Sequence, residues 1–145
     1  PTRVTGMGGH YVDKAMENHD QVNMTIQFQK DHTLIVAGST CNQQGLEPMI
    51  RGHKGTIYLS GSDMIMRPES LFADEIDEVR EQFEGMDPHN TIRRDFLECV
   101  RTRKEPVSPV EHAPKVMVAV ALATRSMWDG KAYAFDPVSM TARAI

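Results

Sequence analysis

Residues 21–40 have the sequence QVNMTIQFQKDHTLIVAGST, and this stretch decides the fold. A period of two places alternate side chains on one face of a β-strand. Here the alternating apolar side chains are Val22, Met24, Ile26 and Phe28. Residues 30–32 are polar, and residues 33–39 form a second run that contains several β-branched residues. The two runs therefore predict an antiparallel hairpin with one apolar face.

The apolar face of this hairpin is expected to form the core. Burial of its four large side chains contributes about 6–12 kcal/mol as an upper estimate, against about 1 kcal/mol for a helix cap. The opposite face carries the uncharged residues Gln21, Asn23, Thr25, Gln27 and Gln29. From the pattern alone, this face is equally compatible with solvent, a partner sheet and a ligand pocket.

The composition is that of an ordinary globular domain. The chain has 145 residues, of which 40% are hydrophobic and 25% charged, and this predicts one domain over residues 1–145. A net charge of −4 argues against nucleic acid and anionic membranes as partners. Two cysteines, Cys41 and Cys99, fit unpaired thiols in a reducing, cytoplasmic compartment and provide no Cys-based metal site.

The chain shows neither a membrane span nor a signal peptide. No apolar run approaches the roughly 20 residues that a span requires, and no charged segment precedes a short apolar one. The sequence begins at Pro1 and enters a strand-like pattern at residues 2–7, so we expect a piece of a longer protein. A targeting segment would then lie upstream.

The first half of the chain predicts about six strands in a largely antiparallel sheet. Besides the hairpin, the predicted strands are residues 2–7, 47–51, 56–60 and 62–66, and a further short strand is predicted at 132–135.

The second half predicts helices. Apolar residues with helical spacing indicate an acidic amphipathic helix over residues 72–83. A second helix should begin with Asp87 as N-cap and Pro88 at its first position. Its basic face suits solvent or pairing with the acidic helix. Residues 108–111, SPVE, fit a capping box, and the apolar run at 116–123 predicts a helix that is buried nearly all round and ends at Gly130.

Few residues carry a recognisable chemistry. Four histidines lie near a carboxylate in the sequence: His10 near Asp13, His19 near Asp20, His32 near Asp31 and His89 near Asp87. None has the spacing of a helical metal site, and GxSxG, P-loop and CxxC motifs are lacking. The glycines at residues 6–9 lack the third glycine position and the helix of a dinucleotide fingerprint. His89 is the strongest candidate, since it lies in the first turn of a predicted helix and could project into a cleft, although it could also simply support the helix cap.

Two motifs resemble one enzyme family. Residues 50–57, IRGHKGTI, are similar to the i-x-G-x-x-G-x-l hairpin of the glucose-fructose oxidoreductase/inositol dehydrogenase/MocA (Gfo/Idh/MocA) family. Residues 89–106 are similar to its H-x-x-x-x-x-x-F-L-x-C-V-R-x-R-x-x-P helix, and a closing strand follows at 130–137. The resemblance covers essentially the whole chain and concerns the C-terminal domain of the family.

The resemblance implies an α+β fold. In the family, this domain is a two-layer structure of the dihydrodipicolinate-reductase-like C-terminal type, with helices on one face of an open-faced, mainly antiparallel sheet. It shapes the substrate pocket and forms oligomers through the open sheet face. The row formed by Gln21, Asn23, Thr25, Gln27 and Gln29 is therefore the expected interface of a homodimer or tetramer.

The resemblance also implies a function for the whole parent protein. The parent would be an NAD(P)-dependent oxidoreductase acting on a sugar, cyclitol or related polyol. Its Rossmann domain, its Glu-Lys-Pro lysine and its Asp-x-x-x-His motif are expected upstream of Pro1, so this chain should hold no catalytic, cofactor-binding or metal-binding residue. The candidate substrate-binding residues are His89, His10 and Asn90. An alternative is a free-standing module that binds a small ligand or dimerises without catalysis.

Overall fold

The computed structural model describes residues 1–83 and 87–145. These residues form two compact units, which we call unit 1 (residues 1–45 and 108–145) and unit 2 (residues 46–107). Each unit is described by itself.

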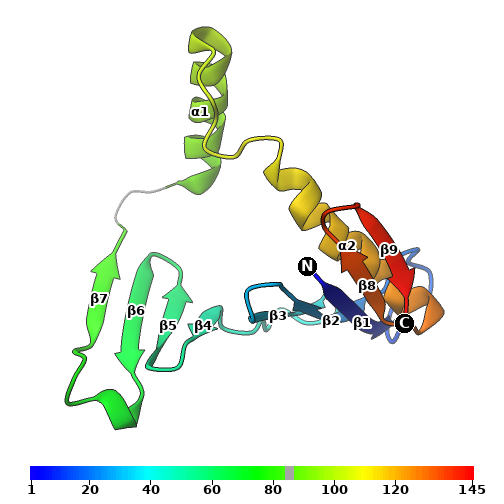
Figure 1. Cartoon of the computed structure of the whole chain (residues 1–145), viewed down its shortest axis with the longest axis horizontal. Coiled ribbons are helices and arrows are strands. Elements are labelled where there is room, and N and C mark those ends of the chain that lie inside the picture. Colours follow the sequence, from blue (N-terminus) through cyan, green and yellow to red (C-terminus); the bar gives the residue numbers. More distant parts are fainter. Residues whose placement is uncertain (84–86) are drawn as a thin grey trace. The chain divides into compact units, whose positions relative to one another are not determined.

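Unit 1 contains a five-stranded antiparallel sheet with the strand order β3-β2-β1-β8-β9 (Figure 1). Its strands are β1 (Arg3–Gly9), β2 (Gln21–Gln27), β3 (Thr33–Ser39), β8 (Tyr133–Asp136) and β9 (Thr141–Ala144). The predicted hairpin is confirmed, because β2 and β3 pair without interruption from Gln21 opposite Ser39 to Gln27 opposite Thr33.

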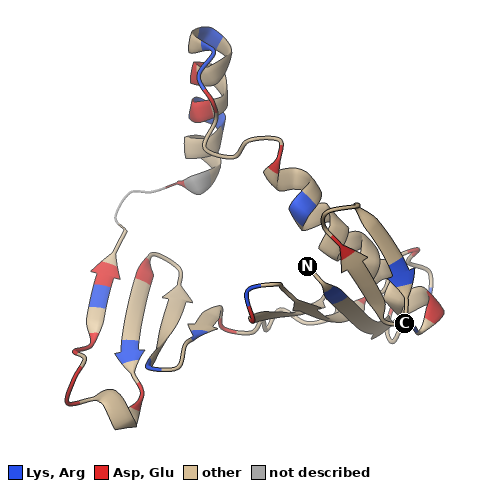
Figure 2. Cartoon of the chain, viewed as in Figure 1, with Lys and Arg blue, Asp and Glu red and all other residues tan. Residues whose placement is uncertain are grey.

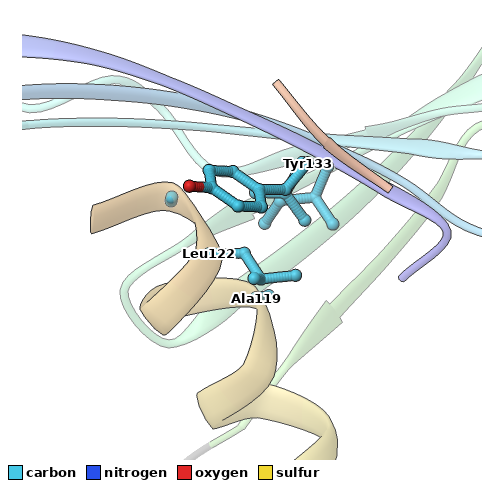
Figure 3. Close-up of a cluster of buried hydrophobic side chains, with 6 residues drawn as sticks. Ala119, Leu122 and Tyr133 are labelled. Atoms are coloured by element: carbon cyan, nitrogen blue, oxygen red, sulfur yellow. The ribbon is translucent and has the colours of Figure 1, made fainter. Parts of the chain in front are cut away.

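The core of unit 1 lies between this sheet and helix α2 (His112–Asp129). From the sheet, Val4, Ile26 and Tyr133 are buried, and Met24 and Phe28 pack against them. From α2 come Ala119, Leu122 and Ala123; Figure 3 shows Tyr133 beside Leu122 and Ala119. The prediction that the core forms on the apolar face of the hairpin is therefore confirmed.

Helix α2 approaches β1 closely because of glycine. A Cβ atom at Gly6 would overlap the carbonyl oxygen of Ala123, so only glycine fits at this crossing. β8 pairs with β1 only at Arg3 and Val4. Beyond that point Ser126 of α2 makes hydrogen bonds to the free edge of β1. Its hydroxyl accepts from Gly6 N at 2.8 Å and donates to Gly6 O at 3.3 Å. One serine thus replaces a strand neighbour.

Unit 2 contains a four-stranded antiparallel sheet with the order β4-β5-β6-β7. Its strands are β4 (Met49–Arg51), β5 (Gly55–Ser60), β6 (Asp63–Pro68) and β7 (Val79–Gln82). A 3₁₀ turn η1 (Ser70–Phe72) precedes β7, and helix α1 (Pro88–Thr102) follows it.

The predicted acidic helix at residues 72–83 is wrong. Only the turn at Ser70–Phe72 is helical, and residues 79–82 pair with β6. Tertiary pairing overrides the helical period here, since Val79 lies opposite Met66 on the sheet and like-charged neighbours weaken a helix. Glu78 instead meets Arg67 at 3.2 Å.

The other two helices are confirmed, with changed limits. Asp87 caps α1 as predicted, its carboxylate accepting from His89 N and Asn90 N at 3.0 and 3.2 Å. The capping box at residues 108–111 is not made, because α2 begins only at His112 with Glu111 as N-cap and no side-chain cap bond. α2 ends at Gly130, which has a positive φ of 70°, as predicted.

Two further expectations need correction. α2 is buried on one face rather than all round, since Val116 and Met117 are more than half exposed. The described residues contain nine strands in two sheets. The sequence predicted about six in the first half and one at 132–135, and β7 and β9 were not anticipated. The class itself is confirmed as α+β with antiparallel sheets, and unit 1 has a helix on one sheet face.

Candidate functional site

The connection between β1 and β2 gathers the polar side chains of unit 1. Gly9 and Gln21 form the last pair of the β1–β2 ladder, so residues 10–20 leave and re-enter the sheet at the same end. Asp20 N donates to Gly9 O at 3.1 Å and closes this loop at its base. His10 and His19 consequently meet at the mouth of the hairpin.

The two histidines form an edge-to-face pair. Their ring centroids lie 4.8 Å apart, with an angle of 77° between the ring planes. Nε2 of His10 and Nδ1 of His19 are buried without a hydrogen-bond partner. Buried ring nitrogens normally have a partner, so these two atoms offer hydrogen-bonding capacity that the described chain leaves unused.

Asp20 holds the start of the β1–β2 loop, next to His10, in place. Its side chain is 1% exposed and accepts from the backbone N–H groups of Tyr11, Val12 and Asp13 at 3.0, 2.8 and 2.9 Å. These bonds hold the pKa of the Asp20 carboxyl well below its usual range, and the bond from Tyr11 N has the largest effect. Asp20 is therefore a structural anion and is unsuited to act as a general acid or base near neutral pH.

Sequence reasoning assigned these neighbours differently. It placed His10 near Asp13 and His19 near Asp20, whereas the structure brings the two histidines together and gives the Asp20 carboxylate to the backbone. The signal that could have found this pair is the hairpin itself, because both histidines flank the ends of the strands that it joins.

Neither cysteine is an activated nucleophile. Both thiols are free; Cys41 is exposed and Cys99 half-buried. Desolvation raises the pKa of both thiols, and nearby carboxylates, Asp20 for Cys41 and Asp95 for Cys99, add to this effect.

His89 and Asn90 lie in unit 2, in the first turn of α1, and both are exposed. The His89 backbone N–H serves the helix cap, while its ring has no part in the two cap bonds. The Asn90 side chain is partly engaged, because Nδ2 donates to the Asp87 carboxylate at 2.6 Å. The His89 imidazole and the Asn90 amide oxygen thus remain for a ligand.

The face of the unit 1 sheet that points away from α2, which we call the outer face, includes Asn23, Thr25 and Gln27 on β2, all exposed. Gln21 is half-buried and donates to Ser39 Oγ at 2.7 Å, and Gln29 lies past the end of β2. The row is therefore shorter on the strand than the sequence predicted. The outer face also carries Met7 and Ile35, which are 74% and 60% exposed.

The described residues do not fit a nicotinamide dinucleotide. Such a cofactor needs a glycine turn that leads from a strand into a helix N-terminus. Here the glycines of β1 lead into an antiparallel partner, and the first free N–H groups of α1 are occupied by Asp87. Within residues 1–83 and 87–145, no cluster of three metal-ligating side chains occurs. Neither described helix is long and apolar enough to cross a membrane.

Comparison with known proteins identifies the fold. No protein-family model matches the chain, and no curated protein matches it in sequence. The chain is similar in structure to an oxidoreductase from Agrobacterium radiobacter that was solved with NAD+, L-tartaric acid and magnesium. The TM-score is 0.67 and the identity 18%, over 92% of this chain and 43% of that one.

A second similar structure is that of yvaA from Bacillus subtilis, a protein assigned as an oxidoreductase. Its TM-score is also 0.67, with 14% identity over 94% of this chain and 45% of that one. This chain thus spans less than half the length of either protein. The described fold is thus similar to part of each of these two oxidoreductase structures.

Proposed function

We propose that this chain is the C-terminal, substrate-binding and oligomerisation domain of an NAD(P)-dependent oxidoreductase of the Gfo/Idh/MocA type. The observation that carries the proposal is the fold, which matches less than half of two longer oxidoreductase chains over more than nine-tenths of this one. The nicotinamide would accept or donate hydride in the missing half of the parent, where a Rossmann domain would hold it. Both units of this chain would act as one domain.

In this proposal the domain contributes hydrogen bonds to a sugar, cyclitol or related polyol. His89 and Asn90 are exposed in the first turn of α1, and His10 brings an unpartnered ring nitrogen. Neutral imidazole and carboxamide groups both donate and accept, which suits hydroxyl groups that do the same. His19 joins this set because its ring contacts that of His10.

The outer face of unit 1 would form the oligomer interface, giving a homodimer or a tetramer. Figure 2 shows that β2 and β3 carry no charged residue, so two copies that meet over these two strands would bury no unpaired ion. Arg3 of β1 and Arg143 of β9 lie on the same face and would have to stay at the rim of the interface. The two free thiols favour the reducing cytoplasm as the location.

The coding sequence upstream of Pro1 tests the proposal. A strand followed by G-x-G-x-x-G supports it, because that turn and the following helix bind the pyrophosphate of a dinucleotide. A start codon immediately before Pro1 would favour the free-standing binding or dimerisation module instead.

Calorimetric titration provides the matching biochemical test. The isolated chain should show no binding of NAD(H) or NADP(H) at micromolar concentration, whereas the full-length parent should bind one of them. Micromolar binding by the isolated chain would show that the cofactor site has been assigned to the wrong part of the protein.

A further inference from the structure

Helix α2 has a second apolar surface, on the side that points away from its sheet. The sheet of unit 1 covers only the face of α2 that holds its buried residues. Successive residues of a helix are turned by about 100°, so residues at spacings of three and four share a face. Five such residues lie roughly opposite the buried face, and we call them the α2 stripe: Met117, Val120, Ala121, Thr124 and Trp128.

The α2 stripe is largely exposed and carries no charge. Met117, Val120 and Trp128 are 57%, 41% and 66% exposed. Ala121 is exposed as well, and Thr124 is half-buried with its hydroxyl donating to Val120 O at 3.0 Å. The charged residues of α2 lie elsewhere around the helix: Lys115, Arg125 and Asp129. Singly exposed apolar side chains are ordinary, but a row about 17 Å long marks a surface that another layer covers.

The N-terminus of the chain lies beside the start of α2. β1 and α2 run next to each other in the same direction (Figure 1), since Gly6 lies against Ala123 and Gly8 against Met127. Residues 1–6 in extended form span about 17 Å. Residues 112–123 of the helix also rise by about 17 Å. Pro1 therefore lies about level with the first turn of α2, and a segment joined to it leaves unit 1 at the N-terminal end of the α2 stripe.

We propose that the α2 stripe is the surface on which the upstream half of the parent protein docks. This inference rests on the function proposed above, in which that half is a Rossmann domain joined to Pro1. The connection holds the domain next to the stripe at an effective concentration of about millimolar, far above that of a second copy in dilute solution. The facing surface of the Rossmann domain is accordingly apolar at its centre, because a charge buried against the stripe would have no partner.

Trp128 is the expected anchor of this contact. Tryptophan is enriched among the residues that dominate interface energies, and it buries about 150–250 Å² when covered. The other four side chains of the row complete a contact of the size usual between domains of one chain, about 300–750 Å² on each side. Since the α2 stripe and the outer face of the sheet lie on opposite sides of unit 1, docking leaves the outer face open for a second copy.

Hydroxyl-radical footprinting with mass spectrometry tests the docking at natural residues, because the oxidation of methionine follows its exposure. Met117 and Met140 are a matched pair, being 57% and 58% exposed, and Met140 lies in the β8–β9 turn. In the full-length parent, Met117 and Trp128 should oxidise at least five-fold more slowly than in the isolated chain. Met140 should oxidise at the same rate in both.

Three results would overturn the docking. Equal rates for Met117 in the two proteins would show that the upstream half does not cover it. Slow oxidation in the isolated chain at every dilution would assign the stripe to a contact within this chain. Slow oxidation that disappears on dilution would assign it to a second copy.

Calorimetry on the same parent separates the two proposals. A parent that binds neither NAD(H) nor NADP(H) contradicts the proposed function and the docking with it. A parent that binds one of them but leaves Met117 accessible contradicts the docking alone.

A charge in the α2 stripe provides the matching variant. Val120→Glu should raise the oxidation rate of Met117 in the parent to that in the isolated chain. Val138→Glu is the control, since Val138 is 90% exposed in the β8–β9 turn, and it should leave Met117 protected. Circular dichroism checks that the isolated Val120→Glu chain folds, and Ala121→Glu, exposed on the same stripe, replaces it where it does not. Protection of Met117 that survives the charge would rule out docking on this stripe.

Discussion

Asp20 links three strands through a single residue. Its carboxylate binds the start of the β1–β2 loop, its backbone N–H binds Gly9 of β1, and its carbonyl oxygen accepts from Thr40 N at 2.9 Å, just after β3. A buried carboxylate is tolerated only when it is fully hydrogen-bonded, and here three backbone N–H groups supply the compensation.

We expect Asp20→Asn to lower the melting temperature by several degrees at pH 7. Asparagine keeps one acceptor but turns an NH₂ group toward backbone N–H groups, so at least one of them loses its partner. Circular dichroism against temperature measures the effect. Asp31→Asn is the control, because Asp31 is exposed, and asparagine also accepts its positive φ of 51°.

The same variant has a defined pH dependence. In the folded protein the pKa of Asp20 lies well below its ordinary value of 3.8. The contribution of Asp20 to stability is therefore complete above about pH 4 and is lost as the pH falls toward the folded pKa. The difference in melting temperature between wild type and Asp20→Asn should be constant from pH 7 to 5 and shrink below pH 4. A difference that grows on acidification would contradict this role of Asp20.

At the scale of elements, the spacing of apolar residues and the capping signals predicted those helices and strands whose signals lie within their own residues. The alternation over residues 21–29 fixed a strand, and Asp87 with Pro88 fixed the start of α1, because both signals are local. Residues 72–83 show the limit, since their helical spacing lost to the pairing of β7 with β6. A partner strand distant in sequence leaves no trace in the local period.

The contact between α2 and β1 is a second feature that local patterns do not reveal. Ser126 is 3% exposed and supplies the partner that Gly6 would otherwise find in a neighbouring strand. Nothing in the run around residue 126 distinguishes this serine from an ordinary helix residue. Ser126 can bond to Gly6 because β8 pairs with β1 only at Arg3 and Val4 and does not extend to Gly6.

We expect Ser126→Ala to lower the free energy of unfolding by about 1–3 kcal/mol, because the N–H of the half-buried Gly6 loses its acceptor. Chemical denaturation measures this change. Thr124→Ala is the matched control, since the Thr124 hydroxyl bonds only within α2, to Val120 O, and alanine favours the helix. Equal effects of the two changes would show that the Ser126 bond contributes nothing.

At the scale of the whole molecule, the candidate site was only partly predictable. His10, His89 and Asn90 were singled out by sequence, but the pairing of His10 with His19 depends on the hairpin that brings residues 10 and 20 to one end of the sheet. Likewise, the polar row on β2 was evident from alternation. That Met7 and Ile35 lie on the same face as this row follows only from the register of β1, β2 and β3 in the structure.

This outer face leads to the prediction about assembly. Thr25 lies between Thr5 and Ile35, and Asn23 lies between Met7 and Ala37, so exposed apolar side chains flank an uncharged polar centre. Interfaces favour such a mixture, with methionine enriched and charge depleted at the centre. Since closed two-fold symmetry is the commonest arrangement of identical chains, we expect a homodimer, or a dimer of dimers, through this face.

Replacing Thr25 and Gln27 together by glutamate should dissociate the dimer, because two copies of each variant side chain would place four like charges in one interface. The core should survive, since both side chains point away from α2 and are exposed. The double change Gln43→Glu with Gln44→Glu adds the same charge in an exposed loop and should leave the dimer intact. Sedimentation velocity distinguishes the species. A wild-type chain that is monomeric at high concentration, or a Thr25/Gln27 variant that stays dimeric, would place the interface elsewhere.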